Sequence, residues 1–79
     1  MNIFSGIEYE VLRDVDLNRK YDGIEYDSRK VKENYIFVAL EGANVDGHDY
    51  IDSAVKNGAT CIIVSRKVEM KHKVSYVLI

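Results

Sequence analysis

The chain has 79 residues, of which 47% are hydrophobic and 30% are charged, and its formal net charge at pH 7 is −2. This length accommodates one small domain and excludes a second independent hydrophobic core. The balanced composition argues against disorder, and the interspersed acids and bases provide no basic face that would bind a nucleic acid.

The sequence also indicates a reducing compartment away from the membrane. No apolar run approaches the roughly 20 residues that a membrane-spanning helix needs. The single cysteine, Cys61, stands in an apolar run and has no partner for an internal disulfide. We therefore expect a cytoplasmic protein without a membrane partner.

The first 34 residues predict short elements separated by polar turns. Residues 2–12 favour a short amphipathic helix that leads into an extended segment, because 8–12 alternate like a half-buried strand. The charged segment 13–22 indicates a loop or a hairpin connection. A strand is expected at 24–26, ending at Asp27. Residues 28–34 predict a turn, since Asp and Ser side chains bond readily to nearby backbone groups.

The middle of the chain carries the clearest pattern. Residues 35–40, YIFVAL, are apolar at odd and even positions alike, which predicts a central strand covered on both faces. A loop at 42–47 follows. Residues 48–58 then predict a helix that ends at Gly58, with an apolar stripe at helical spacing. The stripe consists of Tyr50, Ile51, Ala54 and Val55.

Two more β-branched runs, 60–64 and 74–79, predict strands on either side of the charged turn 66–73. This order of elements indicates an α/β fold with a small, mixed, mostly parallel sheet and flanking helices. The chain stops within the apolar run Val77–Ile79, for which truncation of a longer polypeptide is the simplest explanation. The alternative is a stand-alone interaction domain that presents an edge strand to a protein partner.

Several motifs follow one another in an order that resembles a known family. They are Asp27-Ser28-Arg29-Lys30-Val31, Ile36–Leu40 with Gly42, and Asp46-Gly47-His48-Asp49-Tyr50-Ile51, then Ala54, Gly58-Ala59 and a β-branched strand. Together they resemble the N-terminal domain of the Mur ligases, which build the peptide stem of bacterial peptidoglycan. The chain is most similar to the MurE type, which adds the third stem residue. The MurF type, which adds the terminal dipeptide, is the alternative.

The resemblance implies that residues 1–79 are the first domain of a three-domain, ATP-dependent amide ligase. This domain would hold the UDP moiety of UDP-N-acetylmuramoyl-L-Ala-D-Glu. The central domain would bind ATP and Mg²⁺, and the third would bind the incoming amino acid. The chain departs from the complete family pattern because it has no G-x-x-x-x-G-K-[ST] phosphate loop. We therefore expect no catalytic residue and no bound cofactor in it, and activity only with the missing central and C-terminal domains.

The resemblance assigns UDP contacts to two segments. Ser28 would touch the UDP moiety directly, since its hydroxyl can both donate and accept a hydrogen bond; the alternative is a serine that caps only its own turn. Tyr26 would present its ring to the nucleotide, and the alternative there is a core position. The backbone of Ala43, Asn44 and Val45 matches the segment that runs along the uracil in the family.

The charged residues of these motifs invite further hypotheses. We do not expect Asp27 and Arg29 to act together on one group, because we place them on opposite faces of an extended segment. A turn or ion-pair role is expected for Asp27, whereas Arg29 either reaches the pyrophosphate or has a similar structural role. Asp46 or Asp49 is expected to cap the helix that follows, with His48 in its first turn. Two histidines and one cysteine do not form a zinc-binding pattern, so no metal site is expected.

Overall fold

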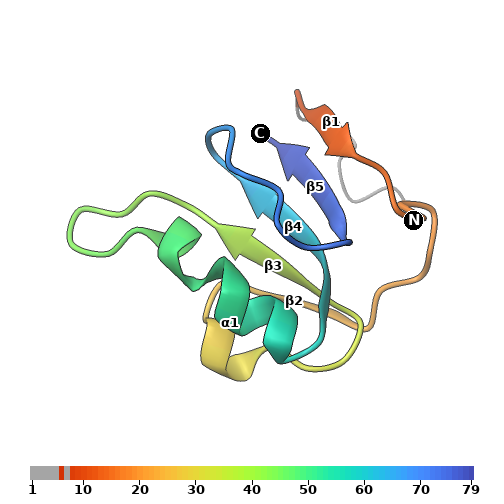
Figure 1. The fold of residues 1–79 in the computed structure, drawn as a ribbon, viewed down its shortest axis with the longest axis horizontal. Helices are drawn as coiled ribbons and strands as arrows, with labels where there is room; N and C mark the ends of the chain where they lie inside the picture. The colour runs from red at the N-terminus through yellow and green to blue at the C-terminus, as the bar shows by residue number, and fades with distance from the viewer. Residues whose placement is uncertain (1–5, 7) are drawn as a thin grey trace.

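Four parallel strands and one antiparallel strand form a single sheet in the computed structural model, which describes Gly6 and residues 8–79 (Figure 1). The spatial order is β1-β5-β4-β3-β2. Strands β2 to β5 run parallel, and β1 pairs antiparallel with β5. The sheet confirms the predicted α/β fold with a mixed, mostly parallel sheet. The strands are β1 (Glu10–Arg13), β2 (Gly23–Glu25), β3 (Tyr35–Ala39), β4 (Ala59–Val64) and β5 (Ser75–Leu78).

The central strands are buried because their apolar side chains alternate between two hydrophobic clusters. Phe37 and Ile62 belong to the cluster beneath the helix, whereas Ile36 and Ile63 belong to the cluster on the opposite face. This confirms the prediction of a strand covered on both faces. The register shifts once near the start of β3, where Thr60 is the additional residue of a bulge in β4.

The helix predicted at 48–58 is present, but its first turn is tighter than an α-helix. A 3₁₀ turn, η2 (Gly47–Tyr50), precedes the helix α1 (Ile51–Lys56). The side chain of Asp46 accepts a hydrogen bond from the backbone N–H of His48 at 2.9 Å, which confirms Asp46 as the cap. A bond to an amide only two residues away favours the tighter turn. Ile51 and Ala54 are buried against the sheet.

The predicted turn after β2 contains a second 3₁₀ turn, η1 (Ser28–Lys30). Together with α1 it lies on one face of the sheet (Figure 1). Strand β2 ends at Glu25, so Tyr26 lies one residue beyond the strand that was predicted to include it. The expected flanking helices therefore consist, in the described residues, of one α-helix and two 3₁₀ turns.

The opposite face of the sheet is covered by the segment 14–22. Leu17 and Tyr21 pack against the cluster that contains Cys61. The hydroxyl of Ser75 accepts a hydrogen bond from the backbone N–H of Val15 at 2.8 Å and donates one to the Val15 carbonyl at 3.1 Å. The segment is a loop rather than a hairpin, because β1 pairs with β5 and not with β2.

Both ends of the chain bear on predictions made from the sequence. The extended segment predicted near residues 8–12 is confirmed by β1, whereas the short helix predicted before it falls largely on residues 1–5 and 7, outside those described. The alternative of an exposed apolar end at 77–79 that docks a partner is wrong for Val77, because this residue is fully buried. Strand β5 lies between β1 and β4, so its backbone groups are already paired. In the described part of the chain no helix is long and apolar enough to span a bilayer.

The end of the helix yields a stability prediction. Gly58 has φ +123°, and a Cβ built there would lie 2.7 Å from the Cα of Glu33. Alanine at this position combines an unfavourable backbone conformation with a backbone clash. We expect Gly58→Ala to lower the free energy of unfolding by about 2–4 kcal/mol in urea unfolding experiments.

The matched control for Gly58→Ala is Lys56→Ala, an exposed position in the same helical end. It should change the free energy of unfolding by less than about 0.5 kcal/mol. Equal effects of the two substitutions would show that the close approach of Gly58 to Glu33 does not constrain the fold.

Candidate functional site

The candidate site lies at the edge of the sheet where β2 and β3 end. Because the two strands are parallel, with Glu25 opposite Phe37, their carboxyl ends meet at one edge. The segment 26–29 and the loop 40–47 leave this edge side by side and enclose a cleft of about 460 Å³. The cleft is lined by Tyr26, Asp27, Ser28, Arg29, Val45, Gly47 and Tyr50.

Ser28 lies at the floor of the cleft and is only 6% exposed. Its carbonyl accepts a hydrogen bond from Asn57 Nδ2 at 2.8 Å, which ties the residue to the end of α1. Its hydroxyl has no hydrogen-bond partner among the described residues. The cap of this turn is Asp27, so the alternative of a turn-capping serine is wrong. The hydroxyl of Ser28 is therefore free to bond a ligand that enters the cleft.

Tyr26 is 80% exposed, so the alternative of a core position is wrong. Tyr26 borders the cleft and also a smaller hollow of about 220 Å³, which Val38 and Leu40 help to line. Val45 borders both as well. An exposed tyrosine and an exposed valine at the mouth of a cleft offer an apolar wall to a flat ring.

Residues 40–47 form a narrow hairpin that projects beyond the end of β3 (Figure 1). Its arms are joined by hydrogen bonds from Gly47 N to the Leu40 carbonyl (2.8 Å) and from Gly42 N to the Val45 carbonyl (2.9 Å). A Cβ at Gly47 would lie 2.8 Å from the Leu40 nitrogen, so only glycine fits where the arms meet. We call residues 40–47 the hairpin loop.

The tip of the hairpin loop offers unpaired main-chain groups. Ala43 and Asn44 are exposed, and in the described part of the chain the N–H groups of residues 43–45 bond to no acceptor. Of the three loop residues predicted from the sequence, Val45 lines the cleft with Tyr26 and Ser28, whereas Ala43 and Asn44 lie outside its lining. Tyr50, predicted only as part of an apolar helical stripe, is half exposed and faces the cleft.

Asp27 and Arg29 form an ion pair, contrary to the expectation that they point to opposite faces. Arg29 Nε and Nη2 donate to the two carboxylate oxygens of Asp27 at 3.1 and 2.9 Å, and the Arg29 backbone N–H donates at 3.0 Å. The prediction treated the two residues as if they were adjacent, but residues two apart in an extended segment point to the same face. Asp27 is the extended cap residue of η1, and its carboxylate accepts from both the backbone and the side chain of Arg29. The hydrogen bonds from the Arg29 side chain and backbone lower the pKa of Asp27 from 3.8 to about 2. The ion-pair role predicted for Asp27 is confirmed.

Behind the hairpin loop lies a polar cluster that the sequence did not predict as a unit. His48 Nδ1 lies 2.6 Å from Asp46 Oδ1, and the backbone N–H of Ser65 donates to His48 Nε2 at 3.2 Å. Arg66 Nη2 donates to Asp46 Oδ2 at 2.8 Å. The hydrogen bonds from the backbone and ring of His48, with the Arg66 charge, lower the pKa of Asp46. The charged turn between β4 and β5 is confirmed, but only the strand order shows that its one arginine, Arg66, reaches the hairpin loop.

No metal centre is apparent in the residues that the structure describes, since no three His, Cys, Asp or Glu side chains gather in a way that could hold an ion. Cys61 is buried, and burial raises the pKa of its thiol to about 11. A thiol held neutral in the core acts as a small apolar side chain rather than as a nucleophile.

Comparison with known proteins gives consistent matches. Residues 20–78 match the family described as "Mur ligase family, catalytic domain". The chain is 87% identical, over its whole length, to the UDP-N-acetylmuramoyl-L-alanyl-D-glutamate–2,6-diaminopimelate ligase of Fusobacterium nucleatum. It is 44% identical over 62 residues to the ligase numbered 2 of the same name from Clostridium acetobutylicum. It spans only 16% and 13% of the lengths of these two relatives.

Solved structures show the same fold. The UDP-N-acetylmuramoylalanyl-D-glutamyl-2,6-diaminopimelate–D-alanyl-D-alanyl ligase from Acinetobacter baumannii matches 75% of this chain with a TM-score of 0.64 and 27% identity. The MurF ligase from Thermotoga maritima, solved in complex with ADP, matches 65% with a TM-score of 0.57 and 41% identity. The chain covers 13% and 12% of those two structures.

The ion pair of Asp27 makes the stability of the chain depend on pH. Because the pKa of Asp27 is lower in the folded chain than its usual 3.8, the unfolded chain binds more protons in this range. The stabilisation is complete above about pH 4 and is lost as the pH falls towards about 2. We expect Asp27→Asn, which keeps the capping acceptor, to flatten the decrease in the free energy of unfolding between these values, measured by urea unfolding.

Arg29→Met is the complementary variant, because it removes the other member of the pair and leaves the Asp27 cap to the backbone intact. It should flatten the same part of the profile. The slope that remains belongs to groups such as Asp46 and Asp52, whose pKa values are lowered by hydrogen bonds from His48 and His72. An unchanged acid slope in both variants would contradict the assignment.

Proposed function

The chain belongs to the Mur ligase family, and from that premise we propose that it is the first domain of a MurE-type ligase and binds the UDP moiety of the substrate. The substrate would be UDP-N-acetylmuramoyl-L-Ala-D-Glu, to which the whole enzyme adds the third residue of the peptidoglycan stem. The observation that carries the proposal is the cleft where β2 and β3 end. Among the described residues the cleft has a Ser28 hydroxyl without a hydrogen-bond partner, and Val45 links it to the loop tip, whose N–H groups at 43–45 bond to no acceptor.

The chemistry of the cleft matches the parts of a uridine nucleotide. The faces of Tyr26 and Val45 supply an apolar wall for the ring, and the free N–H groups at the tip of the hairpin loop supply donors for the carbonyl oxygens of uracil. The Ser28 hydroxyl can bond the ribose or a phosphate oxygen. The guanidinium of Arg29 is exposed at the rim and keeps donors directed to solvent while paired with Asp27, so it can also approach the pyrophosphate.

The remaining parts of the reaction belong to segments outside these residues. The chain has no phosphate-loop sequence, so its own residues do not fit ATP with Mg²⁺, and we assign both to the rest of the ligase. We further propose that the amino acid added is 2,6-diaminopimelate, which the name of the relative at 87% identity specifies, and that the enzyme acts in the cytoplasm.

A MurF-type parent is the second candidate, because the solved structures that match include MurF ligases. A relative named UDP-N-acetylmuramoyl-tripeptide–D-alanyl-D-alanine ligase, from Rickettsia prowazekii, is 45% identical over 56 residues. The two types share this fold, and the much higher identity to a diaminopimelate ligase favours MurE. An amide-forming assay of the full-length enzyme with the UDP-linked dipeptide and with the UDP-linked tripeptide distinguishes them.

We expect UDP titrated into the ¹⁵N-labelled chain to shift the amide signals of Ser28 and of residues 43–45. The variant Ser28→Ala should weaken this binding about tenfold, because it removes one hydrogen bond to a charged or polar ligand. It should leave the free energy of unfolding within about 0.5 kcal/mol of the original, since the hydroxyl has no partner among the described residues.

Ser53→Ala provides the matched control. Ser53 is exposed on α1 and does not line the cleft, so its removal should leave UDP affinity unchanged. Absence of shifts in the original chain at millimolar UDP would contradict an autonomous nucleotide site. Equal affinity of the Ser28→Ala and Ser53→Ala variants would remove Ser28 from the proposed contacts.

A further inference from the structure

Arg66 joins the two arms of the hairpin loop. Its Nη1 donates to Glu41 Oε1 at 3.1 Å, and its Nη2 donates to Asp46 Oδ2 at 2.8 Å. Glu41 and Asp46 face each other across the base of the loop in an isolated antiparallel bridge. One guanidinium therefore spans the two positions at which the loop would open.

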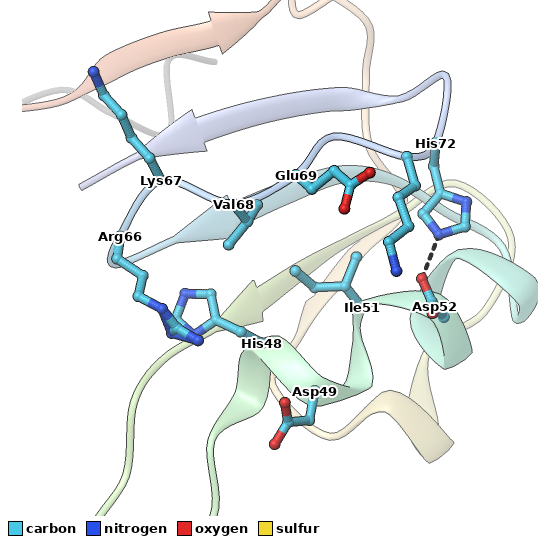
Figure 2. Close-up of a pocket in the computed structure, with 10 residues that line it drawn as sticks. His48, Asp49, Ile51, Asp52, Arg66, Lys67, Val68, Glu69 and His72 are labelled. Carbon is cyan, nitrogen blue, oxygen red and sulfur yellow. Dashed lines mark hydrogen bonds and ion pairs between the residues drawn. The ribbon is translucent and has the colours of Figure 1, made fainter.

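The arginine is itself fixed to the sheet. It follows directly after Ser65, which succeeds the last residue of β4, and the backbone N–H of Ser65 bonds to the ring of His48. Because His48 Nε2 accepts that bond, its Nδ1 carries the proton and donates to Asp46. The guanidinium of Arg66 lies against the His48 ring, with Nη1 3.1 Å from Nδ1 (Figure 2). The contacts therefore connect the hairpin loop to the end of β4 as well as closing it.

We propose that Arg66 is a positioning residue that holds the hairpin loop in the shape that binds the uridine nucleotide. The inference rests on the proposed function, because the loop matters only if residues 43–45 contact the ligand. Arg66 does not line the cleft between Tyr26 and Val45 and touches no group assigned to the nucleotide. It acts on the loop indirectly, through its hydrogen bonds to Glu41 and Asp46.

The size of the effect follows from where the contacts lie. The side chains of Arg66 and Glu41 are 45% and 63% exposed, so the pair contributes little to the global free energy of unfolding. Among the described residues, however, only two main-chain hydrogen bonds join the arms of the loop, and these are the two that form the bridge between Glu41 and Asp46. A loop with few contacts opens locally at low cost, and a ligand that binds it must then supply the ordering entropy. Loss of the Arg66 side chain should therefore lower the order of the hairpin loop and the affinity for UDP, and leave the free energy of unfolding nearly unchanged.

The test compares Arg66→Met with Arg66→Lys and with the control Lys67→Met. Lys67 is the neighbouring cation, but it has a different partner: its Nζ lies 4.0 Å from Oε2 of Glu10. Glu10 belongs to β1, at the other edge of the sheet. In the chain without nucleotide, we expect Arg66→Met to lower the ¹⁵N order parameters of Ala43 and Asn44 from about 0.85 to below about 0.6. The melting temperature should shift by less than about 3 °C.

Binding of UDP provides the second readout. Arg66→Met should weaken it about threefold to tenfold, in line with the cost of ordering a short loop. Arg66→Lys should recover part of the affinity, because it keeps the charge but cannot span both carboxylates as a fork does. Lys67→Met should match the original chain in both readouts.

The two proposals fail separately. Unchanged order parameters at Ala43 and Asn44 in Arg66→Met would overturn the positioning role, whether or not UDP binds. Loss of order without loss of affinity would also overturn it, because the loop shape would then not matter for binding. An original chain with an ordered loop that does not bind UDP would instead contradict the proposed function.

Discussion

The parallel pairing of β2 with β3 is the constraint on which the site depends. The register places Gly23 opposite Tyr35 and Glu25 opposite Phe37, so the two strands end at one edge of the sheet. The segment that begins at Tyr26 and the hairpin loop that begins at Leu40 therefore leave the sheet as neighbours. A slip by one residue would turn the side chains of the short β2 to the other face and move Ser28 away from the cleft.

Rigid and weakly held parts are combined in this small chain. The buried strands and α1 supply a fixed floor, to which Ser28 is tied through Asn57. The walls are loops that depend on carboxylate contacts: Asp27 holds the turn of Ser28, and Asp46 holds the base of the hairpin loop. Exposed contacts of this kind add little to global stability but decide which loop shapes are populated. Binding residues on loops above a rigid scaffold are a common arrangement for ligand recognition.

The sequence predicted the elements better than it predicted how the site is closed. Continuous apolar runs identified β3 and β4 because both faces of these strands are buried, and Gly58 marked the end of the helix because its backbone conformation needs glycine. The resemblance identified Ser28, Tyr26 and Val45, which line one cleft. The pairing of Asp27 with Arg29 was missed because the two were placed on opposite faces, although residues two apart in an extended segment share a face and a cap residue bonds to the turn it precedes. Arg66 was missed because its contact with Glu41 spans 25 positions in the sequence and follows only from the strand order.

The central claim is that Tyr26, Ser28 and the tip of the hairpin loop together hold a uridine nucleotide. The most direct measurement is an isotope-filtered NOE experiment on the labelled chain with unlabelled UDP, which reports the protons that lie near the base. The account predicts NOEs from the uracil H5 and H6 protons to Val45 and to the ring of Tyr26. A second cleft lies between α1 and the turn 66–73 and is lined by residues such as Ile51, Asp52 and His72 (Figure 2). NOEs confined to that cleft, or to the face covered by Leu17 and Tyr21, would contradict the account.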